Sequence, residues 1–307
     1  MNYKYRVYGL DIISEIKIKE FKTISSIDNN SININFGIVP EKFREYRKEG
    51  NIIYLTRKEI WFYIKDLAQF YIKDGKYIIV DTCKEYDNNL LKAYLMCSCL
   101  GFIMLQRNIL AIHGGVLSIN NRGIILTGEK GAGKSTLTAA LIKKGYKFIS
   151  DDVASIRFNN NKPYVMPGFP YQKLCEDSIR RMNIENKNID FFNSNGKVKY
   201  LVPINENIIG KEEEVLYIFQ LVVGKDENIF IEEIRGSKKI EYIIDNIYRG
   251  EYIKNLNGVT PEYFIKCTNI ARNIRFFKIT RPKDKFTVDK QIELIEDKLL
   301  KFDEVVV

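Results

Sequence analysis

Histidine and tryptophan are almost absent from this sequence, and the cysteines follow no pattern of a common metal or disulfide site. The 307 residues include one histidine, one tryptophan and five cysteines. The number of cysteines is odd and no two of them form a C-x-x-C pair; they are Cys83, Cys97, Cys99, Cys175 and Cys267. With a single histidine to help them, the sequence predicts neither a zinc site nor a disulfide framework.

Long apolar runs and targeting signals are also missing. The first residues, MNYKYRVYGL, lack the pattern of a signal peptide. The most apolar stretch, residues 93–105, lies between Lys92 and Arg107 and is too short to cross a bilayer. We therefore expect a cytoplasmic protein with reduced thiols, a buried helix in this stretch and no membrane partner.

Charge of one sign is not concentrated in any block. The 48 lysines and arginines exceed the 39 aspartates and glutamates by 9, and both signs are interleaved along the chain. A basic surface suits polyanions in general. Because no zinc finger, basic zipper or aromatic RNA-binding motif is present, we expect a nucleotide and not a nucleic acid as the anionic partner.

One glycine-rich stretch fits the phosphate-binding motif G-x-x-x-x-G-K-[ST]. An apolar run, residues 123–127, predicts a buried strand before it, and residues 134–144 predict a helix that stops at Gly145. Strand, loop and helix are the context that the motif requires. The predicted nucleotide-binding residues are Gly128, Glu129, Lys130, Gly131, Ala132, Gly133, Lys134, Ser135 and Thr136.

The chemistry of such a loop follows from its residue types. The glycines let backbone N–H groups turn inward into an anion nest, and the helix N-terminus adds positive dipole character. Lys134 can reach the β- and γ-phosphates, and the Ser135 hydroxyl can bind Mg²⁺. The sequence therefore predicts a nucleotide with Mg²⁺.

The first 107 residues predict a mainly β region that ends in an apolar helix. Asp74-Gly75 predicts a hairpin turn, and residues 88–107 predict a helix capped by Asn88 or Asn89 that packs beneath the sheet of the second half. Short strands are expected at residues 3–19, 34–37, 51–55 and 60–64, with polar turns between them. We place the domain boundary near Asn108, giving regions 1–107 and 108–307.

Residues 108–307 predict an α/β domain with a mixed sheet. Residues 109–119 form a β-hairpin with the strand before the loop. Residues 183–197 are polar and predict a mobile loop. Further strands are expected at residues 146–150, 153–158, 198–202, 214–223, 229–234 and 275–279. Helices are expected at residues 176–182, 238–248, 262–269 and 287–301.

Asp151-Asp152 and His113 are the acid and base candidates. The two acids follow the strand after the glycine-loop helix, where one can hold Mg²⁺ and the other can accept the proton of an incoming hydroxyl; the alternative is a solvated turn. His113 lies on the strand that leads to the loop. It either orients or electrostatically tunes an aspartate, or is a structural hydrogen-bonding residue.

These three elements together resemble the catalytic domain of the HPr serine kinase/phosphorylase family. The resemblance is densest over residues 109–156, which include His113-Gly114-Gly115, the glycine loop and Asp151-Asp152. Weaker likenesses occur at residues 167–170, 173–174 and 199–203 and at Arg249. Residues 5–14 are similar to the start of HPr-kinase-like proteins found with ribosomal-peptide clusters, including lasso-peptide serine kinases.

The resemblance implies ATP on the loop and a paired-aspartate site that serves as Mg²⁺ ligand and as base for a serine hydroxyl. It implies Asp152 as the base and Asp151 as the metal or supporting residue, although the two could be exchanged. His113 matches the family's histidine. Lys199 and Arg249 either neutralise the transferring phosphoryl group or have surface or structural duties.

The sequence departs from HPr kinase in two respects. The long glycine-containing signature that follows the acids there is replaced by the polar residues 183–197, and the N-terminal region differs. We therefore do not expect HPr as substrate or the reverse reaction. We expect a kinase for a serine or threonine hydroxyl of a peptide or protein, such as a natural-product precursor peptide. A kinase for free serine and a non-catalytic nucleotide-binding module are the alternatives. Because such relatives are often oligomers, a homo-oligomer is also an expectation.

Overall fold

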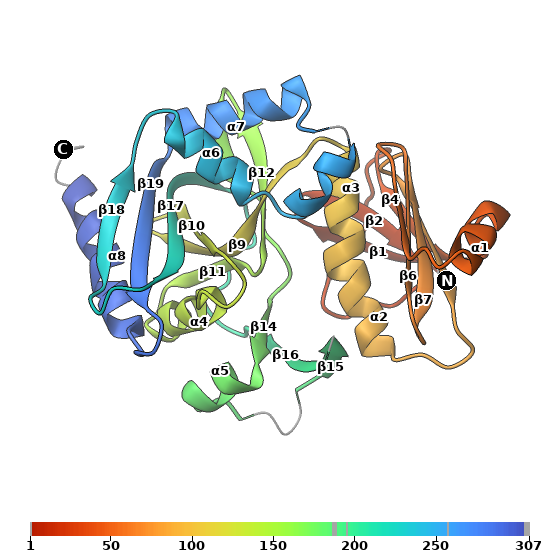
Figure 1. Ribbon diagram of the computed structural model, residues 1–307, viewed down its shortest axis with the longest axis horizontal. Helices are drawn as coiled ribbons and strands as arrows, with labels where there is room; N and C mark the ends of the chain where they lie inside the picture. The colour runs from red at the N-terminus through yellow and green to blue at the C-terminus, as the bar shows by residue number, and fades with distance from the viewer. Residues whose placement is uncertain (1, 186–188, 195, 257, 304–307) are drawn as a thin grey trace.

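Two large β-sheets stand on either side of a long apolar helix in the computed structural model (Figure 1). It describes residues 2–185, 189–194, 196–256 and 258–303. The mixed α/β class and the β-rich N-terminal region that the sequence predicts are both confirmed.

The N-terminal sheet has eight strands in the order β3-β1-β2-β4-β8-β7-β6-β5. The hairpin between β7 and β8 turns at Asp74-Gly75 as predicted, with φ of 54° and 61°. The strands are β1 (Tyr3–Val7), β2 (Leu10–Ser14), β3 (Lys22–Thr23), β4 (Ile32–Phe36), β5 (Ile53–Leu55), β6 (Glu59–Ile64), β7 (Ala68–Lys73) and β8 (Tyr77–Thr82).

One helix of this region was missed, because polar turns were expected between the early strands. Helix α1 (Glu41–Lys48) has a single buried residue, Phe43, whose ring stacks on Trp61 at 5.3 Å between centroids. A short helix with one apolar anchor carries too little hydrophobic periodicity to be distinguished from a polar turn.

The apolar helix is continuous but contains a π-helical turn. It consists of α2 (Asn88–Tyr94), the π turn η1 (Leu95–Cys99) and α3 (Leu100–Gln106). Asp87 caps it, since its Oδ1 accepts the N–H groups of Asn89 and Leu90 at 2.8 and 3.1 Å. The predicted caps, Asn88 and Asn89, are therefore wrong by one and two residues.

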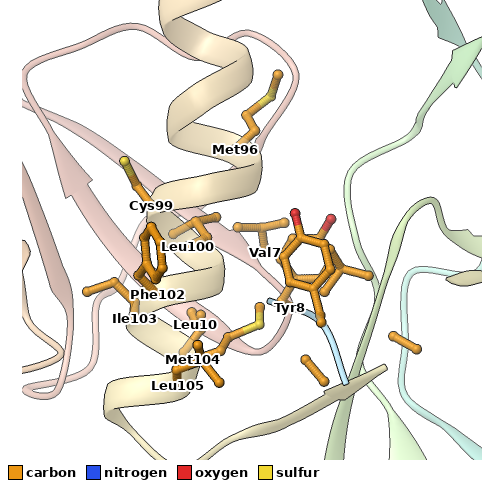
Figure 2. Packing of buried hydrophobic residues seen from close by; sticks show 14 of the residues in the cluster. Val7, Tyr8, Leu10, Met96, Cys99, Leu100, Phe102, Ile103, Met104 and Leu105 are labelled. Atoms are coloured by element: carbon orange, nitrogen blue, oxygen red, sulfur yellow. The ribbon is translucent and has the colours of Figure 1, made fainter. Parts of the chain in front are cut away.

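This helix packs between the two sheets, and the expected contact with the second sheet is confirmed in part, because α3 lies against β9 (Leu110–Ile119). The ring of Phe102 lies 5.7 Å from that of Phe62 in β6. Figure 2 shows its buried side chains gathered with Val7, Tyr8 and Leu10 of the first hairpin. By length and composition the helix could cross a membrane, but 72% of its apolar window is buried inside the protein, which is typical of a core helix.

The main hydrophobic core continues from one sheet to the other. It includes Phe70 of the N-terminal sheet, Leu100 of the helix and Ile112 and Phe276 of the second half. The boundary at residue 108 stays a prediction, and the shared core makes the two halves pack as one body.

The second large sheet closes on itself. Its order is β10-β9-β12-β13-β17-β19-β18, β11 pairs with β9, and β17 pairs in addition with β10, so that five strands form a circuit. The strands are β9 (Leu110–Ile119), β10 (Arg122–Gly128), β11 (Lys147–Ser150), β12 (Val153–Asn159), β13 (Lys162–Val165), β17 (Glu213–Gly224), β18 (Phe230–Ile234) and β19 (Arg275–Pro282).

The hairpin of β9 and β10 is confirmed. Ile119 pairs with Arg122, and Asn120-Asn121 form a two-residue turn with φ of 49° and 60°. Asparagine tolerates this left-handed conformation better than most side chains do, which is why the turn could be predicted.

A third, three-stranded sheet was only partly predicted. It consists of β14 (Tyr171–Cys175), β16 (Lys197–Pro203) and β15 (Phe191–Ser194). β14 was missed, and the predicted mobile loop at 183–197 is wrong over β15; its residues 186–188 and 195 lie outside the described residues.

The helices of the second half agree with the prediction to within a few residues. Helix α4 packs closely on β9 at Gly115. A Cβ at this position would lie 2.5 Å from the Thr138 hydroxyl, so the close contact requires glycine. The helices are α4 (Lys134–Lys143), α5 (Glu176–Arg181), α6 (Lys238–Asp245), η2 (Gly250–Tyr252), η3 (Lys254–Leu256), α7 (Pro261–Asn273) and α8 (Val288–Asp303).

Candidate active site

The glycine loop between β10 and α4 has the backbone that an anion nest requires. Gly128, Gly131 and Gly133 have φ of 135°, 89° and 106°, a region that other residues rarely adopt. A Cβ on Gly128 would lie 2.3 Å from the carbonyl oxygen of Leu221 in β17, so this position also needs glycine for space. Gly133 is the N-cap of α4, which places the helix N-terminus at the loop.

Lys134 is folded back over the loop. Its Nζ donates to the carbonyl oxygens of Gly128 and Glu129 at 2.7 and 3.1 Å. Burial lowers the pKa of Lys134, and the charges of Asp152 and Asp151 oppose that shift. The ammonium group therefore lies within electrostatic range of both acids.

The residues after Lys134 tie the loop to the third sheet and to α5. The Gln172 side chain donates to the Ser135 carbonyl at 2.9 Å, and the hydroxyls of Thr136 and Ser178 are 3.0 Å apart. Glu129 and Lys130 are exposed, so these two predicted residues would act through their backbone.

Asp151-Asp152 form the connection between β11 and β12. The N–H of Gly114 donates to the carbonyl oxygen of Asp152 at 3.0 Å, and the Ser150 hydroxyl donates to that of Val153 at 2.6 Å. Asp152 has a φ of 60°. A left-handed aspartate held by its neighbours is a form of local strain that is common at functional sites.

Both aspartates contact Lys173 of β14, a residue that the sequence did not mark as part of the site. The N–H of Lys173 donates to Asp151 Oδ2 at 2.9 Å, and its Nζ lies 2.5 Å from Asp152 Oδ2. The side chain of Lys173 is 9% exposed and that of Asp152 is 28% exposed. The buried ammonium group of Lys173 thus forms an ion pair with Asp152.

The two acids differ in their electrostatics. Burial, followed by the neighbouring charge of Asp152, raises the pKa of Asp151. Burial is also the largest single influence on Asp152 and acts to raise its pKa, but Lys173, His113 and Lys134 together outweigh burial and hold that pKa well below its usual range. Asp152 is therefore the ionised and more accessible carboxylate of the pair.

His113 lies beside the acids, as its strand position predicted. It pairs with Val153 across β9 and β12, and its N–H donates to the carbonyl oxygen of Asn246 at 2.8 Å. Burial lowers the pKa of His113 to about 4 although Asp152 opposes this shift. A neutral imidazole can orient a neighbour by hydrogen bonding, but it supplies no positive charge at neutral pH.

Arg249 reaches the site together with the π turn of the apolar helix. Its Nη2 donates to the Ser98 hydroxyl at 2.6 Å, and its guanidinium lies 5.4 Å from the ring of Tyr248. On the neighbouring position, Cys97 Sγ accepts from Lys173 Nζ at 2.9 Å. A π turn is frequent at functional sites. Here it brings two consecutive side chains, Cys97 and Ser98, into contact with Lys173 and Arg249.

Lys199 lies on the same side of the molecule but makes fewer contacts. It is half-buried on β16, opposite Cys175 of β14. Its charge adds to the lowering of the pKa of Lys134 and acts to lower that of Asp151. Its ammonium group is therefore within electrostatic range of Lys134 and Asp151.

The described residues contain no group of three or more His, Cys, Asp and Glu side chains close enough to hold a metal ion by themselves. Mg²⁺ commonly takes one or two protein ligands and completes its shell with phosphates and water. Asp151 fits this role, because its Oδ2 accepts the Lys173 N–H and its Oδ1 would serve as the metal ligand, while Ser135 stands at the start of α4.

The site contains several residues that the sequence could not reveal. They come from segments far apart in the chain and were hidden in an apolar helix, a missed strand or a loop; they are Cys97, Ser98, Gln172, Lys173 and Asn246. The likeness at residues 173–174 was the one available signal.

Comparisons with known proteins agree with this geometry. The sequence model of the HPr Serine kinase C-terminal domain matches residues 106–176. The HPr kinase/phosphorylase of Clostridium beijerinckii is 27% identical over 145 residues, covering 47% of this chain and 38% of that protein. The corresponding protein of Clostridium acetobutylicum is 32% identical over 103 residues, covering 29% of this chain and 33% of that protein.

A solved structure of the Hpr(Ser) kinase/phosphatase from Coxiella burnetii matches with a TM-score of 0.34 and 16% identity, covering 64% of this chain and 93% of that chain. The matches to the two clostridial proteins span about a third of those proteins' own length. Residues 106–176, which match the HPr Serine kinase C-terminal domain, include the glycine loop, His113 and the acid pair, so this part of the chain is similar to that family's domain.

Proposed function

We propose that this chain is an ATP- and Mg²⁺-dependent kinase that phosphorylates a serine, or threonine, hydroxyl of a peptide or protein. The observation that carries the proposal is the meeting of Lys134 with Asp151 and Asp152. Lys134 and both acids are held near one another by β14, because Gln172 donates to the Ser135 carbonyl at 2.9 Å and the N–H of the next residue, Lys173, donates to Asp151 Oδ2 at 2.9 Å. A phosphate nest facing an acid pair is what transfer to a hydroxyl requires.

The roles of the acids follow from their environments. Asp152 would accept the hydroxyl proton as the acceptor oxygen bonds to the γ-phosphorus and the bond to the β-phosphate oxygen breaks. Its carboxylate is the more exposed of the two. Asp151 is enclosed and would hold Mg²⁺ with the Ser135 hydroxyl, which shields the charge of the phosphates.

Cations from four elements would stabilise the transferring phosphoryl group. Lys134 comes from the loop, Lys173 from β14, Lys199 from β16 and Arg249 from the segment after α6. Charge neutralisation in a water-poor site contributes much of the rate of phosphoryl transfer. We add Lys173 to the cations predicted from the sequence, because its ammonium group contacts Asp152, the proposed base.

A peptide or protein acceptor is supported by the place of the opening residues. Residues 5–14 carry the likeness to kinases of ribosomal-peptide clusters, and Tyr8 in that stretch reaches the site. The Tyr8 N–H donates to Pro167 O at 2.8 Å, and Tyr8 O accepts from the Ser155 hydroxyl at 3.2 Å. The first hairpin thus contacts the strand that leaves the acid pair.

The test is phosphoryl transfer by the purified chain with Mg²⁺-ATP and a panel of acceptors, read by mass spectrometry. The panel holds serine-containing peptides encoded near the gene, HPr and free serine. We expect a phosphopeptide from the wild type and none from Asp152→Asn, with Asp151→Asn restored in part by higher Mg²⁺. Labelling of free serine alone would contradict the peptide assignment. Tight nucleotide binding without any transfer, unchanged in Asp152→Asn, would contradict a kinase.

A further inference from the structure

The outer face of the glycine loop is covered by an arginine that the motif does not predict. Arg281, at the end of β19, donates from Nε to Ala132 O at 2.8 Å and from Nη1 to Pro282 O at 2.9 Å. Its Nη2 lies 3.4 Å from Gly131 O. The guanidinium therefore lies against the loop, at the end of a strand that is separated from β9 by β17 and β10.

A second arginine and an exposed aromatic ring continue this surface. The Arg181 guanidinium, at the end of α5, lies 5.4 Å from the centre of the Phe286 ring, in the segment between β19 and α8. Phe286 is 57% exposed. Burial, followed by the charge of Arg181, lowers the pKa of Arg281, and both α5 and Arg281 are tied to the glycine-loop segment, through Ser178–Thr136 and Arg281–Ala132.

Neither guanidinium has a carboxylate partner within the described part of the chain. The ion pairs around them are Arg180–Glu176 and Lys285–Glu227. Two cations without a counter-ion repel each other, and their proximity is favoured when an anion lies between or beside them.

A triphosphate bound on the glycine loop would extend toward the surface formed by Arg281, Arg181 and Phe286. In this motif the lysine serves the β- and γ-phosphates, and the γ-phosphate must lie beside the acids, so the α-phosphate and the nucleoside leave the loop on the opposite side. There the Thr136 and Ser178 hydroxyls, 3.0 Å apart, tie α5 to the start of α4. α5 and its Arg181 are thus held beside the exit of the nucleoside.

We propose that Phe286 and Arg181 form the subsite for the base of the nucleoside triphosphate, and that Arg281 binds its α-phosphate side. The inference rests on the proposed nucleotide site. An exposed aromatic ring can stack on any base, and a guanidinium group can pack on an aromatic ring at the same time. The subsite selects for a nucleoside triphosphate over a bare polyphosphate.

Binding of Mg²⁺-ATP and of Mg²⁺-tripolyphosphate, measured by calorimetry on the full chain, tests the subsite. We expect Phe286→Ala to weaken ATP binding about tenfold, in the range of one lost stacking contact, and to leave tripolyphosphate binding unchanged. Phe264→Ala removes another exposed phenylalanine, on α7, and serves as the matched control. Equal losses for both ligands, or no loss for ATP, would overturn the proposal.

Phe286→Trp gives a direct optical readout. The natural Trp61 is buried in the N-terminal sheet and provides a constant background. ATP, but not tripolyphosphate, should quench the new fluorescence. If the wild type binds tripolyphosphate as tightly as ATP, the base subsite is refuted while the phosphate site stands; if it binds neither, the proposed function fails and the subsite with it.

Discussion

A lysine–carboxylate pair is buried in each half of the described chain, and the two pairs differ in what surrounds them. Lys92 Nζ lies 2.7 Å from Glu20 Oε1, with side-chain exposures of 5% and 0%. Lys173 Nζ lies 2.5 Å from Asp152 Oδ2, with exposures of 9% and 28%. The first pair is closed to solvent on both sides, whereas the carboxylate of the second remains accessible.

The difference shows how one interaction serves two purposes. Lys92 fixes helix α2 to the segment after β2, and its partner has a second oxygen, Glu20 Oε2, without a hydrogen bond among the described residues. Lys173 holds a carboxylate that a ligand can still reach, with help from Cys97. A closed pair contributes to the fold, and a half-open pair prepares a reactive group.

Removing the accessible carboxylate should have the largest effect. Asp152→Asn loses the proton acceptor but keeps the volume, so we expect kcat to fall by about 10³-fold, in the range of general-base losses. Nucleotide affinity should stay within a few-fold of the wild type. Asp226→Asn, an exposed aspartate, is the control for steady-state assays. Full activity in Asp152→Asn would assign the base elsewhere, with Asp151 first.

Opening the closed pair should affect stability and not chemistry. Lys92→Met leaves Glu20 buried without a partner, and such losses cost about 3–5 kcal/mol. Urea unfolding monitored by circular dichroism gives the free energy of unfolding. The double variant Lys92→Met/Glu20→Leu should recover most of the loss. A drop in kcat of the folded Lys92→Met protein, without a loss of stability, would remove the contrast between the pairs.

Lys173→Met sharpens the comparison at the half-open pair. Without the ammonium, Asp152 loses its orienting partner and the transferring phosphoryl group loses a cation, so we expect kcat to fall by about 10²-fold. KM for ATP should change little, because Lys134 holds the phosphates. Lys173→Arg keeps the charge and should recover part of kcat. If Lys173→Met lowers only the unfolding temperature, the two pairs have the same role.

The smallest expected effect is a pH dependence of stability from His113. Its folded pKa of about 4 lies below the unfolded value of about 6.5, so the unfolded chain binds a proton first. The stability associated with neutral His113 is complete above pH 6.5 and is lost as the pH falls from 6.5 to 4. His113→Gln should flatten this part of the profile in urea titrations. An unchanged slope would show that folding does not shift the pKa of His113.

The sequence predicted the parts of the site that are local in the chain. The hairpin of β9 and β10, the glycine loop and α4 are consecutive, so turn residues, apolar runs and the motif specify them together. The position of Asp151-Asp152 after the next strand was also predictable, because a short connection returns the chain to the same sheet. These elements brought Lys134, His113 and both acids into one prediction.

The remainder depends on contacts between distant segments. Lys173 was hidden because β14 follows a proline-rich bend and was not recognised as a strand, and Arg281 sits at the end of the last strand, 150 positions from its partner Gly131. Cys97 and Ser98 lie in an apolar helix whose periodicity suggested burial alone. A π turn cannot be predicted from a local sequence pattern, because it shifts the helical hydrogen-bond register by only one residue.

The π turn at Leu95–Cys99 also has a consequence for how the protein can change over time. Because Cys97 and Ser98 contact Lys173 and Arg249, the register of this helix sets the position of two of the cations that we propose act in catalysis. Inserting or deleting one residue in the helix would rotate every later side chain by about 100° and remove both contacts. The surface residues and loops of the N-terminal half can therefore change during evolution, whereas the length of its helix cannot. A different N-terminal region would need a helix of the same length to keep these contacts.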